Sequence, residues 1–257
     1  MIRLRLGWLD GLTADRDSLC RDMDEALMRG ASFSVGFVNP HVFVTAEQAP
    51  VVRDFLSACD RICIDGLGIV IAHRLFGRAR LPRVVAEQLF RAHWTGSAVR
   101  ADALLIGIEA DDIERAAVAL NEASDSLRVV GTLHGFADDE AIDAFVTVSS
   151  SEPDNATGNA RYVLIGAGSP RSEAIAARVR AARPDALIFH CGAGTLKTWA
   201  GAKRRAPAQV SRWGLEWVHR IVFEPHARAR YLLGGPRFLA ALWRARTTRH
   251  HLGVRSS

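Results

Sequence analysis

The chain has 257 residues, of which 49% are apolar, enough to bury a large core as one domain or as a core with an appendage. Its net charge of +5 averages two opposite regions: residues 197–257 hold 13 lysines and arginines against two acids, and the remainder holds 20 against 26. No apolar run approaches the roughly 18 residues of a membrane-spanning helix, and Arg5 and Asp10 interrupt the N-terminal apolar stretch, so we expect a cytosolic protein without a signal peptide.

From there on, short apolar runs alternate with helical patterns, which is typical of an α/β fold. The predicted strands are 33–38, 61–64, 103–108, 127–133, 161–165 and 186–190. The predicted helices are 13–29, 49–59, 68–76, 84–94, 111–124, 138–149 and 171–182. Because strands and helices alternate regularly over residues 101–190, we expect an α/β core whose sheet is mostly parallel. We place this core at residues 1–196 and a C-terminal helical appendage at 197–257.

Residues that directly follow the predicted strands are the candidate ligand contacts, because ligands of parallel sheets bind at the carboxyl ends of the strands. Asn39 follows the first strand. Glycine turns follow two later strands, and they contain Gly166, Gly168, Ser169 and Pro170, and then Gly192 and Gly194. Such turns present backbone N–H groups to an anion. Each glycine could be a turn former only, and neither turn matches a dinucleotide fingerprint. Their convergence on one rim nevertheless favours a phosphate or nucleotide site.

Asp65 is the most specific single position. It ends an apolar strand and precedes two glycines, so it is expected at the ligand edge of the sheet. One interpretation is a general base. The alternative is an aspartate that caps the following helix near Gly68.

The acidic, cysteine and histidine patterns predict no metal site. The sequence Asp22-Met23-Asp24 lies in a helical pattern, and we interpret it as a solvated helix face. The four cysteines and nine histidines show no metal-ligand spacing. We therefore expect no cofactor and assign the cysteines to packing.

The appendage interleaves arginines with aromatic residues. Around Arg212, residues 213–222 carry an apolar face at roughly helical spacing. This pattern suits an interfacial helix on an anionic membrane. It also suits a clamp for phosphates, because guanidinium groups bind phosphate oxygens in a bidentate way. Nucleic acid is the competing polyanion, and a solvated basic face is the simplest alternative.

Together these residues resemble the WecG/TagA/CpsF family of bacterial glycosyltransferases, over about residues 33 to 239. The matches in the appendage are Gly201, Lys203, Arg204, Arg205-Ala206-Pro207, Gly214-Leu215-Glu216-Trp217, Arg220, Glu224-Pro225, Arg230-Tyr231 and Pro236-Arg237-Phe238. The matches elsewhere are Asn39, Asp65-Gly66-Leu67-Gly68, Arg74, Gly77, Arg83, Leu89-Phe90, Gly131, His134-Gly135 and Gly166 to Pro170 with Glu173.

The resemblance implies a Rossmann-like α/β core with a C-terminal appendage. It also implies an inverting, metal-independent transferase that moves an N-acetylmannosamine-type or related sugar from a UDP-sugar to a lipid-diphosphate-linked saccharide. It implies a role in cell-surface or exopolysaccharide biosynthesis at the inner face of the cytoplasmic membrane, with the appendage touching an anionic membrane surface. Asp65 would be the base, Asn39 and Arg83 would bind substrate, and Arg212 and Arg220 would reach the diphosphate. Self-association into a homo-oligomer is compatible with the resemblance.

Four departures from the usual family pattern lie near the expected pocket. Phe37 replaces a threonine, and Gln88 replaces the aspartate of a Gly-x-Asp motif after Arg83. Ser172 replaces a glutamine, and Lys197 replaces an aspartate. Because Asp65, Arg83 and the appendage remain, we favour altered specificity over lost activity.

Two other functions compete with this prediction. A non-catalytic relative would use its basic appendage to dock on membranes. A nucleic-acid-binding protein ranks last, because no recognised nucleic-acid motif is present, and we therefore expect no nucleic-acid partner.

Overall fold

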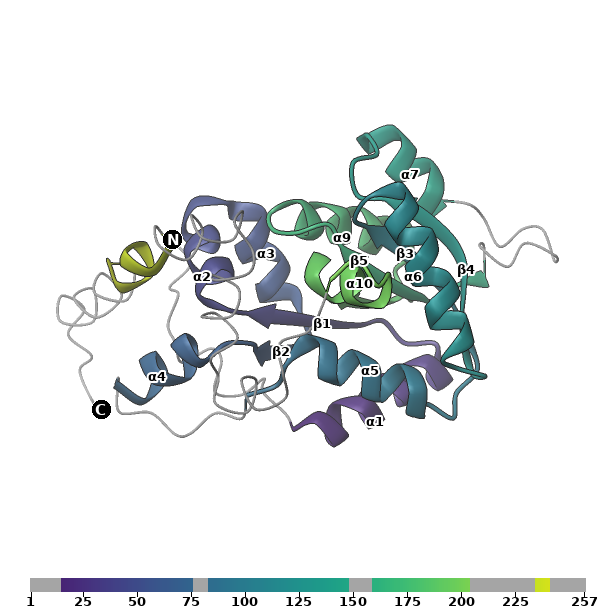
Figure 1. Cartoon of the computed structure of the whole chain (residues 1–257), viewed down its shortest axis with the longest axis horizontal. Helices are drawn as coiled ribbons and strands as arrows, with labels where there is room; N and C mark the ends of the chain where they lie inside the picture. The colour runs from purple at the N-terminus through teal and green to yellow at the C-terminus, as the bar shows by residue number, and fades with distance from the viewer. Residues whose placement is uncertain (1–14, 76–82, 148–158, 204–233, 241–257) are drawn as a thin grey trace.

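The computed structural model describes residues 15–75, 83–147, 159–203 and 234–240 (Figure 1). Within them a six-stranded, all-parallel sheet has the order β2-β1-β6-β5-β3-β4. The strands are β1 (Phe33–Val38), β2 (Arg61–Ile64), β3 (Ala101–Gly107), β4 (Leu127–His134), β5 (Tyr162–Gly166) and β6 (Leu187–His190). The predicted α/β class is therefore confirmed.

Helices cover both faces of the sheet. They are α1 (Arg16–Arg29), α2 (Pro40–Gln48), α3 (Pro50–Ala58), α4 (Leu67–Leu75), α5 (Ala86–Gly96), α6 (Ala110–Glu122), α7 (Asp139–Thr147), α9 (Arg171–Ala182) and α10 (Ala193–Trp199). Figure 1 shows α1 and α5 together on one side of the sheet, with α2, α3 and α9 on the other. A further short helix spans residues 234–240.

Alternation of side chains along the strands produces two separate core clusters. Val38 and Ile64 face one side, where they pack with residues of α2, α3, α4, α7 and α9. Phe37 and Cys63, one position earlier on each strand, face the other side, which α1, α5, α6 and α10 cover. Since successive strand residues point to opposite faces, a buried parallel strand must be apolar at nearly every position.

The predicted strands agree with the structure to within two residues at each end, but two helices were missed. From its sequence position, Asn39 was expected to follow the first strand as a candidate ligand contact, without a helix directly after it. In the structure Asn39 is the N-cap of α2, and its side-chain oxygen accepts a hydrogen bond from the Val42 N–H at 3.0 Å. Proline at the first helical position is favourable, because its missing N–H would have had no intrahelical partner. The second missed helix, α10, runs across the expected domain boundary at 196/197.

Candidate functional site

Asp65 lies at the carboxyl edge of the sheet, directly beside Asn39. The pairing of Val38 with Ile64 brings the ends of β1 and β2 together, and the Asp65 N–H donates to the Val38 carbonyl at 2.9 Å. The residue is half-buried. Burial and the nearby Asp65 charge together raise the pKa of the Cys63 thiol to about 12. The carboxylate is thus neither packed into the core nor remote from the ligand edge.

Arg83 reaches the same place from a different part of the chain. It forms a parallel bridge with Ile64, and the Val84 N–H donates to the Ile64 carbonyl at 3.0 Å. This short extended segment continues the sheet edge next to β2 and leads into α5. Arg83 is therefore a neighbour of Asp65 at this edge of the sheet.

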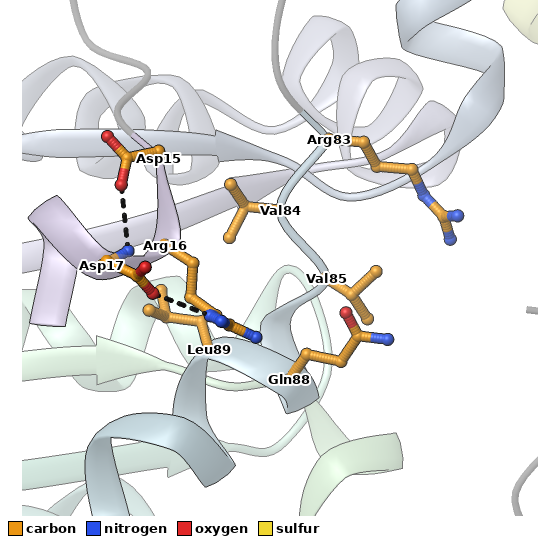
Figure 2. A pocket seen from close by; sticks show the side chains of 8 residues that line it. All are labelled: Asp15, Arg16, Asp17, Arg83, Val84, Val85, Gln88 and Leu89. Carbon is orange, nitrogen blue, oxygen red and sulfur yellow. Dashed lines mark hydrogen bonds and ion pairs between the residues drawn. The ribbon is translucent and has the colours of Figure 1, made fainter. Parts of the chain in front are cut away.

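A pocket of about 340 Å³ opens beside Arg83, between the first turns of α1 and α5 (Figure 2). Its lining residues are Asp15, Arg16, Asp17, Arg83, Val84, Val85, Gln88 and Leu89. Asp15 caps α1, and Arg16 pairs with Asp17 at 3.1 Å, so these polar groups already have partners. In Figure 2 the Arg83 guanidinium extends away from Asp15 and Asp17. The exposed amide of Gln88 has no hydrogen-bond partner among the described residues.

The two glycine turns lie at the same edge, after β5 and β6. Gly168 and Gly192 have φ angles of +81° and +73°, which disfavour any residue with a side chain. A Cβ built on either would meet no described atom within 4 Å, so the space in front of both turns is open in the described part of the chain. Gly166 differs, because it is buried and a Cβ there would lie 2.5 Å from the Leu196 side chain.

Sequence reasoning did not include Lys203 among the site residues. A Cβ built on Gly194 would lie 3.7 Å from the Lys203 Nζ, so this ammonium group stands over the turn after β6. Its backbone N–H donates to the Lys197 carbonyl at 3.0 Å, which fixes the chain after α10. The family match at Lys203 was the available signal for this position.

The sheet order gives the site its elongated shape. Strands in a sheet are 4.7–4.9 Å apart, so Asp65 after β2 lies about 14 Å from the turn after β5, three strands away. Asn39 and the turn at Gly192 lie between these two ends. Asp65 and the turn after β5 therefore occupy opposite ends of one row.

Beneath the glycine turns lies a buried polar pair that sequence reasoning also missed. Glu173 and His190 are 1% and 5% exposed, and Nε2 of the histidine lies 3.7 Å from Oε1 of the glutamate. The Ser169 hydroxyl donates to the same oxygen. Burial lowers the pKa of His190 and outweighs the opposite effect of the Glu173 charge, so the imidazole is expected to be neutral at neutral pH.

Arg212 and Arg220 lie outside the described residues, but part of the appendage is described. Phe238, on the helix over residues 234–240, is 7% exposed and packs against the first core cluster. Its ring meets Phe43 of α2, with centroids 5.6 Å apart, and lies 3.6 Å from a Cβ built on Gly68 of α4. This piece of the appendage therefore packs on α2 and α4, the two helices that directly follow Asn39 and Asp65.

Comparison with known proteins decides the family. The profile described as "Glycosyl transferase WecG/TagA/CpsF family" matches residues 8–252. The chain belongs to this family. A curated relative from Bacillus spizizenii is named N-acetylglucosaminyldiphosphoundecaprenol N-acetyl-beta-D-mannosaminyltransferase. It is 26% identical over 230 residues, which cover 84% of this chain and 81% of the relative. The prediction of a glycosyltransferase is therefore confirmed at the level of the family.

The four departures from the usual family pattern differ in whether their side chains are buried or line the pocket. Phe37 is 4% exposed and packs against Phe189 at a centroid distance of 5.4 Å. Ser172 is fully buried, and its hydroxyl accepts a hydrogen bond from the Ala167 N–H at 2.9 Å. Neither side chain faces the open space at the turns. Gln88, by contrast, lines the pocket beside Arg83.

The fourth departure, Lys197, is matched by a residue on another element. Its Nζ lies 2.9 Å from Oε1 of Glu109, at the start of α6. The hydrogen bond from Lys197 lowers the pKa of the Glu109 carboxyl. The basic side chain is thus accommodated by an acidic partner.

The interpretation of Asp22-Met23-Asp24 as a solvated helix face was wrong, although these residues do lie on helix α1. Met23 is fully buried, and Asp22 pairs with Arg61 at 2.9 Å. Asp24 accepts a hydrogen bond from Ser97 at 2.6 Å and lies 3.0 Å from the buried ring of His93. Helical periodicity alone could not reveal these partners, because all three come from distant segments.

Among the described residues, no group of three or more His, Cys, Asp or Glu side chains could hold a metal ion. No helix in the part of the chain that the structure describes is long and apolar enough to cross a membrane.

Proposed function

We propose that this family member is an inverting glycosyltransferase that moves an N-acetylmannosamine-type or related hexose from a UDP-sugar to a polyprenyl-diphosphate-linked saccharide. The observation that carries the proposal is the position of Asp65. It is a half-buried carboxylate beside Asn39 and Arg83, at the same sheet edge as the two open glycine turns. The family and the name of the Bacillus spizizenii relative support the reaction class and the kind of acceptor.

The proposed reaction is a single displacement. Asp65 removes the proton from the acceptor hydroxyl, and the resulting oxygen attacks the anomeric carbon on the face opposite UDP. The bond between that carbon and the phosphate oxygen breaks, its electrons leave with UDP, and the configuration inverts. A positioned base of this kind contributes about 10²–10⁴-fold to the rate.

The departing diphosphate requires positive charge, which this chain can supply itself. We expect free backbone N–H groups of the turns at 166–170 and 192–194 to donate to the diphosphate, because glycine turns of this kind commonly bind anions. Lys203 stands over the second turn. Arg212 and Arg220 would add guanidinium groups from the appendage. With these groups the reaction would need no metal ion, because fixed cations would stabilise the developing charge on UDP.

We assign the appendage at residues 197–257 to the membrane side of the reaction. Its 13 basic residues would hold the protein peripherally at the inner face of the cytoplasmic membrane, where the lipid-linked acceptor lies. The product would enter cell-surface or exopolysaccharide biosynthesis.

The test is a screen of UDP-sugars with lipid-diphosphate-linked saccharides, in which released UDP is measured with and without a chelator. The wild-type protein should turn over at least one pair, and Asp65→Asn should lower kcat by about 10²-fold or more with little change in UDP affinity. Asp54→Asn, an exposed aspartate on α3, is the matched control.

Two results would contradict the proposal. One is wild-type turnover in Asp65→Asn. The other is binding of wild-type protein to anionic vesicles without any affinity for UDP, which would favour a non-catalytic membrane-docking relative.

A further inference from the structure

The first turn of α9 connects the carboxyl ends of three strands. Arg171 donates to the carbonyls of Gly135 and Ala137, in the loop after β4. Ser172 accepts from the Ala167 N–H in the turn after β5. Glu173 accepts from the Ser169 hydroxyl and faces His190, the last residue of β6. Three consecutive side chains therefore connect the carboxyl ends of β4, β5 and β6 to one helix.

Glu173 is the unusual member of this group. It is 1% exposed, and its Oε2 has no hydrogen-bond partner among the described residues. Burial of an incompletely bonded carboxylate is unfavourable, although the N-terminal end of α9 partly offsets its charge. A buried ionisable pair of this kind usually stabilises a fold less than apolar side chains of similar volume would. Stability alone is therefore a poor reason for its presence.

His190 connects the same carboxylate to the second glycine turn. Its ring packs against Phe55, with centroids 5.6 Å apart, and neither ring nitrogen has a hydrogen-bond partner within the described ranges. Two residues later in the chain, Gly192 begins the turn that leads into α10. Glu173 thus contacts the residue that precedes one turn and a side chain within the other.

We propose that Glu173 is a positioning residue that fixes the relative placement of the turns at 166–170 and 192–194, and so the cradle for the donor's diphosphate. The inference rests on the proposed function, because it assigns these turns to the UDP moiety. Glu173 acts through Ser169 and His190 and touches no reacting atom. Asp65 lies about 14 Å from the turn after β5 and about 10 Å from the turn after β6. Loss of Glu173 should therefore weaken donor binding without changing the chemical step.

The experiment compares Glu173→Gln, Ser169→Ala and their double variant in full-length protein, with donor KM, acceptor KM, kcat and the Kd of UDP as readouts. Glu173→Gln should raise the donor KM and the UDP Kd about tenfold, as expected for loss of a charged hydrogen bond. Ser169→Ala should act in the same direction, and the double variant should be no worse than Glu173→Gln. Values of kcat and acceptor KM should change less than about twofold.

Two further variants separate positioning from general destabilisation. Ser169→Thr retains the hydroxyl and should restore most of the donor affinity. Glu122→Gln, an exposed glutamate at the end of α6, should behave as wild type. If Glu173→Gln fails to fold, the comparison of Ser169→Ala with Ser169→Thr carries the test, because Ser169 lies in a half-buried turn.

Unchanged donor KM in Glu173→Gln, or equal losses in donor KM and kcat, would overturn this inference while leaving the transferase assignment intact. A wild-type protein that neither binds UDP nor transfers sugar would instead contradict the proposed function, and the inference with it.

Discussion

The rings of Phe43 and Phe238 meet edge to face, with centroids 5.6 Å apart and planes at 87°, although they come from opposite ends of the chain. Phe43 belongs to the helix that Asn39 caps, and Phe238 also approaches Gly68, three residues after Asp65. The contact therefore packs part of the appendage against α2 and α4, the helices that follow Asn39 and the candidate base Asp65.

Replacement of Phe238 should uncouple the helix over residues 234–240 from the core. Truncation of a buried phenylalanine to alanine costs about 3–5 kcal/mol of packing free energy. A helix as short as residues 234–240 depends on such packing for its stability. We expect Phe238→Ala to lower sugar transfer by at least about tenfold and to reduce hydrogen-exchange protection at residues 234–240. Leu239→Ala, at a neighbouring position that is 66% exposed, should retain both. Wild-type transfer by Phe238→Ala would argue against a role for this contact.

A truncated protein that ends at Lys203 should fold but not transfer sugar. The last described segment of the core ends there, since Leu196 and Ala200 are buried in the second cluster and Trp199 stacks on Arg91 at 4.3 Å. Circular dichroism should show a cooperative transition with a lower midpoint than that of the full chain, because the packing of Phe238 on the core is lost. UDP release with a lipid-linked acceptor should be abolished. Full activity of the truncated protein would refute the assignment of the appendage to the reaction.

Gln88 should influence which sugar is used. Its exposed amide lines the pocket beside Arg83, at the position where the family usually has aspartate. A carboxylate only accepts hydrogen bonds, whereas the Gln88 amide also donates them. Gln88→Asp should therefore change the preference among sugars about tenfold, as expected for one or two hydrogen bonds. The Kd of UDP should stay near wild type. The measurement is kcat/KM for several UDP-sugars and acceptors, and unchanged ratios would place the specificity elsewhere.

Asp24 should stabilise the fold in a pH-dependent way. Burial acts to raise the pKa of this carboxyl, but hydrogen bonds from His93 and Ser97 outweigh it, so the pKa lies below its ordinary value of 3.8. The stabilisation is therefore complete above pH 3.8 and is lost as the pH falls through the lower native pKa. Asp24→Asn should lower the free energy of unfolding by about 1–3 kcal/mol at neutral pH.

Urea unfolding of the wild-type protein and Asp24→Asn, at neutral pH and in acid, measures this effect. The difference between the two proteins should shrink as wild-type Asp24 becomes protonated. Asp54→Asn, on the exposed face of α3, should show no comparable loss. A difference that stays constant with pH would mean that the charge of Asp24 does not contribute.

Much of the site could be predicted from local pattern. Asp65 and Asn39 each end an apolar run, and parallel strands collect such positions at one edge. The two glycine turns were found by the same rule. Arg83 needed the family resemblance, because its bridge to Ile64 joins segments that no local pattern connects. The helix α2 was missed because Asn39-Pro40 signals both the end of a strand and the start of a helix.

The sequence by itself determined the α/β class, the basic appendage, the family and the row of strand-end residues. These depend on periodicity, composition and ordered motifs, which are local properties of the chain. Only the tertiary structure decided that Glu173 meets Ser169 and His190, that Asp24 has buried partners, and that Phe238 packs behind Asn39 and Asp65. The physical reason is that burial and pairing of a side chain depend on which distant segments the fold brings against it, and spacing along the chain does not encode that information.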